Sequence, residues 1–176
     1  SINLESFKML KTIRLKKDLS STRPKPISGK LILEDGTIFT GLKIGYKGSS
    51  VGEVCFNTSM TGYQEIITDP SYAGQIINFT FPHIGNVGTN FDDNESYKSF
   101  AKGVIINCDI SDPSNFRSIQ HLDAWLKKKK LPGLCNVDTR ALTNKIRNDG
   151  ALKGGIADKI KKDDLKIFKK EIKKWH

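Results

Sequence analysis

The stretch at residues 57–90 reads NTSMTGYQEIITDPSYAGQIINFTFPHIGNVGTN, and the interpretation of the whole chain starts from it. It places Thr, Ser, Asn, Asp, Gly and Pro around two short apolar runs, Ile66-Ile67 and Ile76-Ile77. Such residues favour turns because their side chains bond to nearby backbone groups or because they set unusual dihedral angles. Strand-like pieces between such turns indicate ordered loops on a rigid scaffold, where binding groups commonly lie. Well-made turns without a binding role explain the same pattern.

Three segments of this stretch resemble the signature of the small, glutamine-hydrolysing chain of carbamoyl-phosphate synthase, in the order and spacing of that family. They are residues 57–65 (NTSMTGYQE), 68–72 (TDPSY) and 81–86 (FPHIGN). Further similar segments lie on both sides, at residues 33–37, 52–54, 114–117, 138–143 and 150–152. The resemblance runs from about residue 29 to about residue 156. It implies the N-terminal domain of that chain.

The expected fold class is α/β, and two kinds of argument support it. Strand-rich pieces followed by helices interleaved with strands indicate an α/β or α+β domain. The resemblance implies a layered β/β/α fold of the swivelling-domain type, with a mixed sheet and flanking helices. We divide the chain into a basic N-terminal extension or linker (1–28), the small-chain N-terminal domain (29–157) and a basic amphipathic helix (158–176). The resemblance implies that this helix leads to a glutaminase domain absent from this chain.

The net charge of +10 belongs to the two ends of the chain. Residues 1–30 carry eight Lys or Arg and two acids, and residues 158–176 carry eight Lys and four acids. Residues 31–157 hold thirteen residues of each sign. A binder of nucleic acid or of membrane surfaces remains an alternative, but a basic end is more often a solvated face.

Three cysteines, Cys55, Cys108 and Cys135, include no CxxC pair. Cys55 and Cys108 lie in apolar strand-like runs, which predicts buried thiols in a reducing compartment. A stand-alone thiol enzyme is the competing hypothesis and requires one of these two thiols to be exposed and ionised. No apolar run reaches the length of a membrane span.

Local patterns predict the main elements. Two β-prone runs, 30–34 and 37–41, flank Asp35-Gly36, a pair that favours a type I′ turn. A strand is expected at 53–56, a short helix at 61–67 stopped by Asp69-Pro70, and further strands at 75–81, 104–110 and 134–137. Helices are expected at 118–130, after a cap at Asp138 or Thr139, and along the stripe Leu165, Phe168, Ile172 and Trp175.

The resemblance points to Ser71 as the one substrate contact, a serine that helps to hold glutamine together with the glutaminase domain. A turn cap after Pro70 is the alternative role for this hydroxyl. His83 fits a structural role better than that of a catalytic base, because no nucleophile for it can be named. Arg117 and Arg140 are candidate donors to carboxylates at interfaces, or members of ion pairs within the domain. The remaining motif positions are assigned to packing and to the large-subunit interface: Asn57, Thr61, Gly62, Tyr63, Gln64, Glu65 and Asp69.

The resemblance implies a role without catalysis in this chain itself. The full small chain hydrolyses glutamine and passes ammonia to a large subunit, which makes carbamoyl phosphate for pyrimidine and arginine synthesis. The expected partners are that large subunit, the glutaminase domain and L-glutamine, with no nucleic acid and no membrane. No cofactor or metal is expected in this chain, since ATP and Mg²⁺ act on the large subunit. We expect a cytoplasmic protein, with an organellar location as the alternative, and a stand-alone non-catalytic interaction domain as the alternative function.

Overall fold

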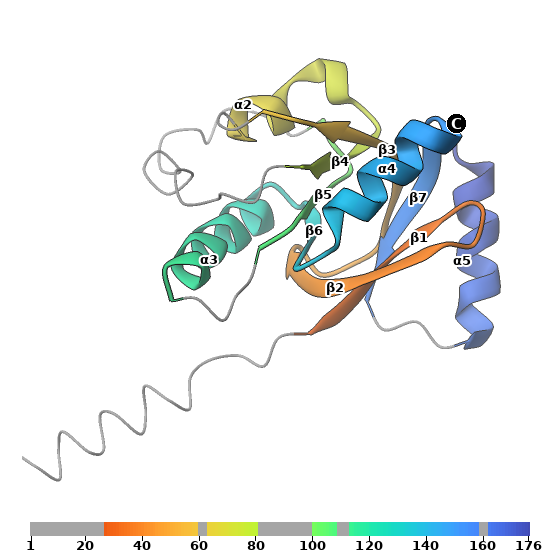
Figure 1. Ribbon diagram of the computed structural model, residues 1–176. Helices are drawn as coiled ribbons and strands as arrows, with labels where there is room; N and C mark the ends of the chain where they lie inside the picture. The colour runs from red at the N-terminus through yellow and green to blue at the C-terminus, as the bar shows by residue number, and fades with distance from the viewer. Residues whose placement is uncertain (1–26, 60–62, 81–99, 109–112, 159–161) are drawn as a thin grey trace, which may run out of the picture.

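The computed structural model describes residues 27–59, 63–80, 100–108, 113–158 and 162–176 (Figure 1). The predictions at Thr61, Gly62 and His83 and for the extension at 1–26 lie outside these residues. Along the described chain the elements are β1 (Ser28–Leu33), β2 (Ile38–Gly45), β3 (Ser50–Asn57), α2 (Tyr63–Thr68), the 3-10 helix η1 (Pro70–Tyr72), β4 (Gln75–Phe79), β5 (Gly103–Ile106), α3 (Pro113–Lys128), β6 (Pro132–Cys135), α4 (Thr139–Asp149), β7 (Leu152–Ala157) and α5 (Lys162–Lys174).

The strands form one mixed sheet that closes into a barrel, in the order β1-β2-β6-β5-β4-β3-β7. The pairs β3–β4, β4–β5 and β5–β6 are parallel, and the other four pairs are antiparallel. Parallel neighbours need a crossover connection, and α2 with η1 lies between β3 and β4 while α3 lies between β5 and β6 (Figure 1). The α/β class and the mixed sheet with flanking helices are therefore confirmed.

Strand β7 closes the barrel, and the sequence patterns did not predict it. It pairs with β1 on one side and with β3 on the other. Its sequence LKGGIA lacks a continuous β-prone run because two glycines stand in its centre. A Cβ at Gly154 would lie 2.8 Å from Val54 Cγ2 and 3.1 Å from Leu33 Cδ2. Close packing against its two neighbouring strands therefore requires glycine at position 154, and this glycine weakens the local strand pattern of β7.

The β1–β2 hairpin is confirmed, but its predicted type I′ turn is wrong. Only Gly36 of the Asp35-Gly36 pair has a positive φ, +91°. The Gly36 N–H donates to Leu33 O at 2.9 Å, and the Leu33 N–H donates to Thr37 O at 2.9 Å. This is a three-residue loop in which a left-handed glycine follows a turn. The Thr37 N–H also donates to Asp35 Oδ1 at 3.0 Å.

Several predicted boundaries are shifted. Helix α3 begins at Pro113 instead of residue 118, because proline suits the first helical position, where its missing N–H costs nothing. It ends at Lys128 instead of Lys130, which has a positive φ of 55°. Strand β5 ends at Ile106, so Cys108 lies beyond it, although it is buried as expected. Strands β4 and β6 are likewise shorter or shifted relative to 75–81 and 134–137.

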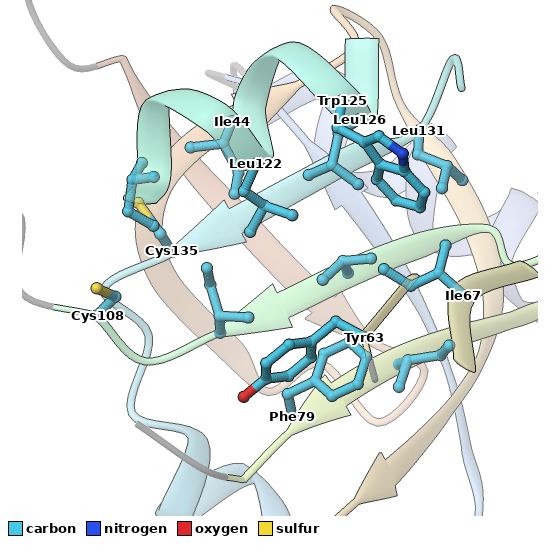
Figure 2. Packing of buried hydrophobic residues seen from close by; sticks show 14 of the residues in the cluster. Ile44, Tyr63, Ile67, Phe79, Cys108, Leu122, Trp125, Leu126, Leu131 and Cys135 are labelled. Carbon is cyan, nitrogen blue, oxygen red and sulfur yellow. The ribbon is translucent and has the colours of Figure 1, made fainter. Parts of the chain in front are cut away.

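The buried side chains form three clusters, and alternation along the strands explains them. The first, which we call the outer cluster, joins the sheet to α2 and α3 (Figure 2) and includes Ile67, Ile77, Phe79, Leu122 and Trp125. The second fills the barrel and includes Leu31, Val54, Ile76, Leu134 and Ile156, with Leu142 and Ile146 of α4 packed among them. The third lies under α5 and comprises Ile32, Ala157, Phe168 and Ile172.

Helix α5 packs on its own domain. It contacts β1, β3 and β7, with Phe168 and Ile172 buried and Leu165 partly buried against them. Burying two such side chains contributes about 1.5–3 kcal/mol each. The predicted apolar stripe is confirmed, and its last member, Trp175, lies so close to Gly74, just before β4, that a Cβ on this glycine would be 2.9 Å from the indole ring.

Candidate functional site

The motif residues within the described chain lie at the end of β3 and in the connection between β3 and β4, which contains α2 and η1. Asn57 is the last residue of β3, and Tyr63, Gln64 and Glu65 form the first turn of α2. Asp69 and Ser71 belong to the turn around η1. The structure thus brings these six predicted residues into one segment of the fold; the list is Asn57, Tyr63, Gln64, Glu65, Asp69 and Ser71.

Arg117 and Arg140 lie elsewhere, on α3 and α4 respectively, and both are exposed. Among the described residues neither of them forms an ion pair with a carboxylate. The prediction that they bind partner carboxylates stays a prediction.

Asp69 shapes the turn that carries Ser71. Its Oδ1 accepts the Ser71 N–H at 2.9 Å, which caps the 3-10 helix. The Asp69 N–H donates to Ile66 O at 3.2 Å, and the Tyr72 N–H donates to Asp69 O at 3.0 Å. Hydrogen bonds from the backbone and side chain of Ser71 lower the pKa of Asp69, so this cap is an anion at neutral pH.

Ser71 is exposed and lies in the middle of η1. Its backbone N–H and its hydroxyl both bond to the Asp69 carboxylate, and the residue lies at the surface. A serine hydroxyl both donates and accepts hydrogen bonds, so it can contact an amide, an amine or a carboxylate. The capping role expected as the alternative belongs to Asp69.

Asn57 connects three parts of this segment. Its side-chain Nδ2 donates to Tyr72 Oη at 2.8 Å, and its Oδ1 accepts the Ser59 N–H at 2.7 Å. Its backbone carbonyl accepts both the N–H of Thr80, at 3.1 Å, and the hydroxyl of Thr80, at 3.3 Å. Asn57 therefore holds together the end of β3, the end of β4 and η1.

Tyr63 is a core residue. Its ring packs edge-to-face on Phe79, with centroids 4.6 Å apart and planes at 77° (Figure 2). Only 6% of the residue is exposed, and burial together with the nearby Cys108 raises the pKa of its phenol. Of the two roles that the sequence suggested for Tyr63, the structure supports packing.

The cysteine thiols are poorly suited to nucleophilic chemistry. Burial, and then the charge of Glu53, raise the pKa of Cys55 to about 11. Burial raises the pKa of Cys135 to about 12, and Cys108 is only 3% exposed. A nucleophilic cysteine needs a thiolate near neutral pH. These thiols therefore oppose the hypothesis of a stand-alone thiol enzyme.

Two residues of the site were not singled out from the sequence. Tyr72 and Thr80 both bond to Asn57, and Tyr72 also packs against the outer cluster. Tyr72 stands next to Ser71 in the TDPSY segment, which was the available signal. Its partner lies 15 residues away in the sequence, and only the crossover of the chain brings the two together.

Two properties of the described part of the chain bear on metal binding and on membranes. No cluster of three or more His, Cys, Asp or Glu side chains there could hold a metal ion. No helix there is both long and apolar enough to cross a membrane.

Comparison with known proteins places the chain among relatives. The family model described as the carbamoyl-phosphate synthase small chain, CPSase domain, matches residues 31–156. The carbamoyl phosphate synthase small chain of Agrobacterium fabrum is 54% identical over 159 residues, which cover 88% of this chain and 39% of that relative. The one from Bartonella henselae is 48% identical over 172 residues, covering 95% of this chain and 42% of the relative. The chain thus spans about two fifths of the length of these relatives. It belongs to the carbamoyl-phosphate synthase small-chain family.

Proposed function

We propose that this chain is the N-terminal, large-subunit-docking domain of the small chain of a glutamine-dependent carbamoyl-phosphate synthase. On this proposal a glutaminase domain releases ammonia from glutamine, and the large subunit uses it with ATP and Mg²⁺. The 176-residue chain has no catalytic residue of its own and works in the cytoplasm. Its barrel corresponds to the layered swivelling domain of the family.

The observation that carries the proposal is the position of Ser71. The residue is exposed, and the Asp69 carboxylate bonds to both its backbone N–H and its hydroxyl. A group displayed in this way can bind a ligand held mainly by another domain, at little entropic cost to itself. The family match over residues 31–156 makes glutamine the ligand expected there.

The role of Ser71 is tested in the full-length small chain assembled with its large subunit. Ser71→Ala should raise the KM for glutamine about 10-fold, because one hydrogen bond to the substrate is lost. The rate with ammonium salts as nitrogen source should not change, since ammonia bypasses glutamine. Ser49→Ala is the matched control, because Ser49 is also exposed but lies between β2 and β3. An unchanged KM in the Ser71 variant would contradict the proposed hydrogen bond from Ser71 to glutamine.

The docking role is tested separately by size-exclusion chromatography with light scattering. This chain mixed with the large subunit should elute as a one-to-one complex. A basic protein of similar size is the control for non-specific charge attraction, since this chain carries a net charge of +10. Two unshifted peaks would contradict docking by this domain alone.

A further inference from the structure

We propose that Asn57 and Tyr72 are positioning residues for Ser71, acting through the hydrogen bond between them. This inference rests on the proposed role of Ser71 in holding glutamine. Neither side chain is assigned a contact with the substrate.

The 3-10 helix η1 cannot position Ser71 by itself. It has three residues, none of them buried. Such a short 3-10 segment has few internal hydrogen bonds, so its orientation depends on what anchors its ends. On the N-terminal side the anchor is Asp69, which is itself exposed.

The anchor on the C-terminal side is Tyr72. Its ring packs against the outer cluster, and its Oη accepts the Asn57 Nδ2–H at 2.8 Å. Packing alone restricts the ring but leaves it free to slide, whereas a hydrogen bond sets the distance between two particular atoms. Tyr72 is the next residue after Ser71, so a displacement of the tyrosine moves the serine as well.

The amide of Asn57 has only one orientation that satisfies its neighbours. The backbone N–H of Ser59 can only donate, so the side-chain atom facing it at 2.7 Å must be Oδ1. Nδ2 is then directed to Tyr72 as a donor. The backbone carbonyl of Asn57 accepts both Thr80 hydrogen bonds. The backbone of Asn57 is therefore held at the junction of β3 and β4, and its side-chain amide fixes η1 relative to these strands.

Three variants test the inference: Tyr72→Phe, Asn57→Ala and the combination of both. Tyr72→Phe keeps the ring in the outer cluster and removes only the acceptor, so the fold should persist. Tyr46→Phe is the matched control, because Tyr46 is an exposed tyrosine in the β2–β3 connection.

The first measurement is amide hydrogen exchange in this chain. Tyr72→Phe should speed exchange of the Tyr72 and Ala73 amides, which donate to Asp69 O and Pro70 O, by about 5- to 10-fold. Exchange in α4 should not change. If exchange at Tyr72 and Ala73 is as slow as before, the bond does not anchor η1 and the inference is overturned.

The second measurement is the KM for glutamine in the assembled full-length enzyme. Each single variant should raise KM about 3- to 10-fold, with kcat and the ammonium-driven rate unchanged. The double variant should be no worse than the more affected single variant, because both remove the same bond. If Ser71→Ala raises KM but the Tyr72 and Asn57 variants do not, the inference fails while the proposed function stands. If Ser71→Ala does not raise KM either, both the inference and the proposed role of Ser71 are contradicted.

Discussion

Helix α4 and the 3-10 helix η1 both attach to the strand pair β3–β4, but different interactions hold them there. On β4, Asn78 bonds to α4, while the adjacent Phe79 faces α2 and the outer cluster. Helix α4 inserts Leu142 and Ile146 into the barrel cluster. By contrast, η1 has no fully buried residue: Tyr72 is partly buried against the outer cluster, and individual hydrogen bonds hold the rest of η1.

The hydrogen bonds of the two regions also differ in how deeply they are buried. Asn78 is fully buried and donates to Thr143 Oγ1 at 3.0 Å and to Thr139 O at 3.4 Å. The Thr143 hydroxyl in turn donates to Thr139 O at 2.7 Å. Because loss of a buried partner carries the desolvation penalty of the group left behind, changes at α4 should cost stability. At η1 the Asp69–Ser71 bond is exposed and the Asn57–Tyr72 bond is only partly buried, so changes there should alter function at a smaller cost in stability than changes at α4.

The largest expected effect on stability is in the barrel cluster, where α4 packs. Leu142→Ala should lower the free energy of unfolding by about 2–5 kcal/mol, because Leu142 is fully buried and its loss leaves a cavity. Urea unfolding of this chain measures the change. The control is Ile167→Ala on α5, where 60% of the side chain is exposed and the cost should stay below about 0.5 kcal/mol. Equal losses in the two variants would contradict the assignment of α4 to the core.

The next effect compares the same substitution, Thr to Val, in α4 and at the end of α2, which directly precedes η1. Thr143→Val should cost about 1–2 kcal/mol, because it leaves Asn78 Nδ2 with only the 3.4 Å contact to Thr139 O. Thr68→Val removes a similar bond, from Thr68 Oγ1 to Gln64 O at 2.7 Å, at the half-buried end of α2. It should cost less than about 0.5 kcal/mol in the same urea experiment. If the two cost the same, burial is not what distinguishes the regions.

A smaller effect should appear at low pH. Burial raises the pKa of Asp35, but hydrogen bonds from Lys145 and Thr37 outweigh it and bring it from 3.8 to about 2. Lys145 Nζ lies 2.7 Å from Asp35 Oδ2 and ties the β1–β2 turn to α4. Since the folded-state pKa is the lower one, the stabilisation is complete above about pH 4 and is lost as the pH falls toward 2.

The measurement is the stability difference between the parent chain and Asp35→Asn across this pH range. The Asp35 side chain is 36% exposed, so solvent screening limits the difference at neutral pH to less than about 1 kcal/mol. The difference should shrink between pH 4 and 2. A difference that grows as the pH falls would contradict the sign of this shift.

The smallest expected effect on stability is at η1. Ser71→Ala should change the free energy of unfolding by less than about 0.5 kcal/mol, because Ser71 is exposed, water can replace its hydroxyl at Asp69, and Asp69 still caps the backbone. Thermal and urea unfolding of this chain measure it. A loss above about 1 kcal/mol would show that the hydroxyl supports the fold itself.

Much of the fold and part of the site could be predicted from the sequence. Asp138, one of the two residues expected to cap α4, accepts the Ala141 N–H at 3.0 Å, and Gly150 follows the end of that helix. The Asp69-Pro70 pair stops α2 as predicted. The TDPSY segment of the family signature predicts Ser71 as a substrate contact, and that role stays a prediction; the bond of its neighbour Tyr72 to Asn57 has no local sequence signal, because the two residues are 15 positions apart.

The sequence by itself determined the features that arise between residues a few positions apart: caps, turn residues, the apolar faces of α3 and α5, and the motif of the family. Only the tertiary structure decided that β7 enters between β1 and β3 and closes the barrel. It also decided the Asn78–Thr143 bond, across 65 residues, and the Asn57–Tyr72 bond, across 15. The physical reason is that such partners meet only after the strands pair, so no local pattern of residues encodes their distance.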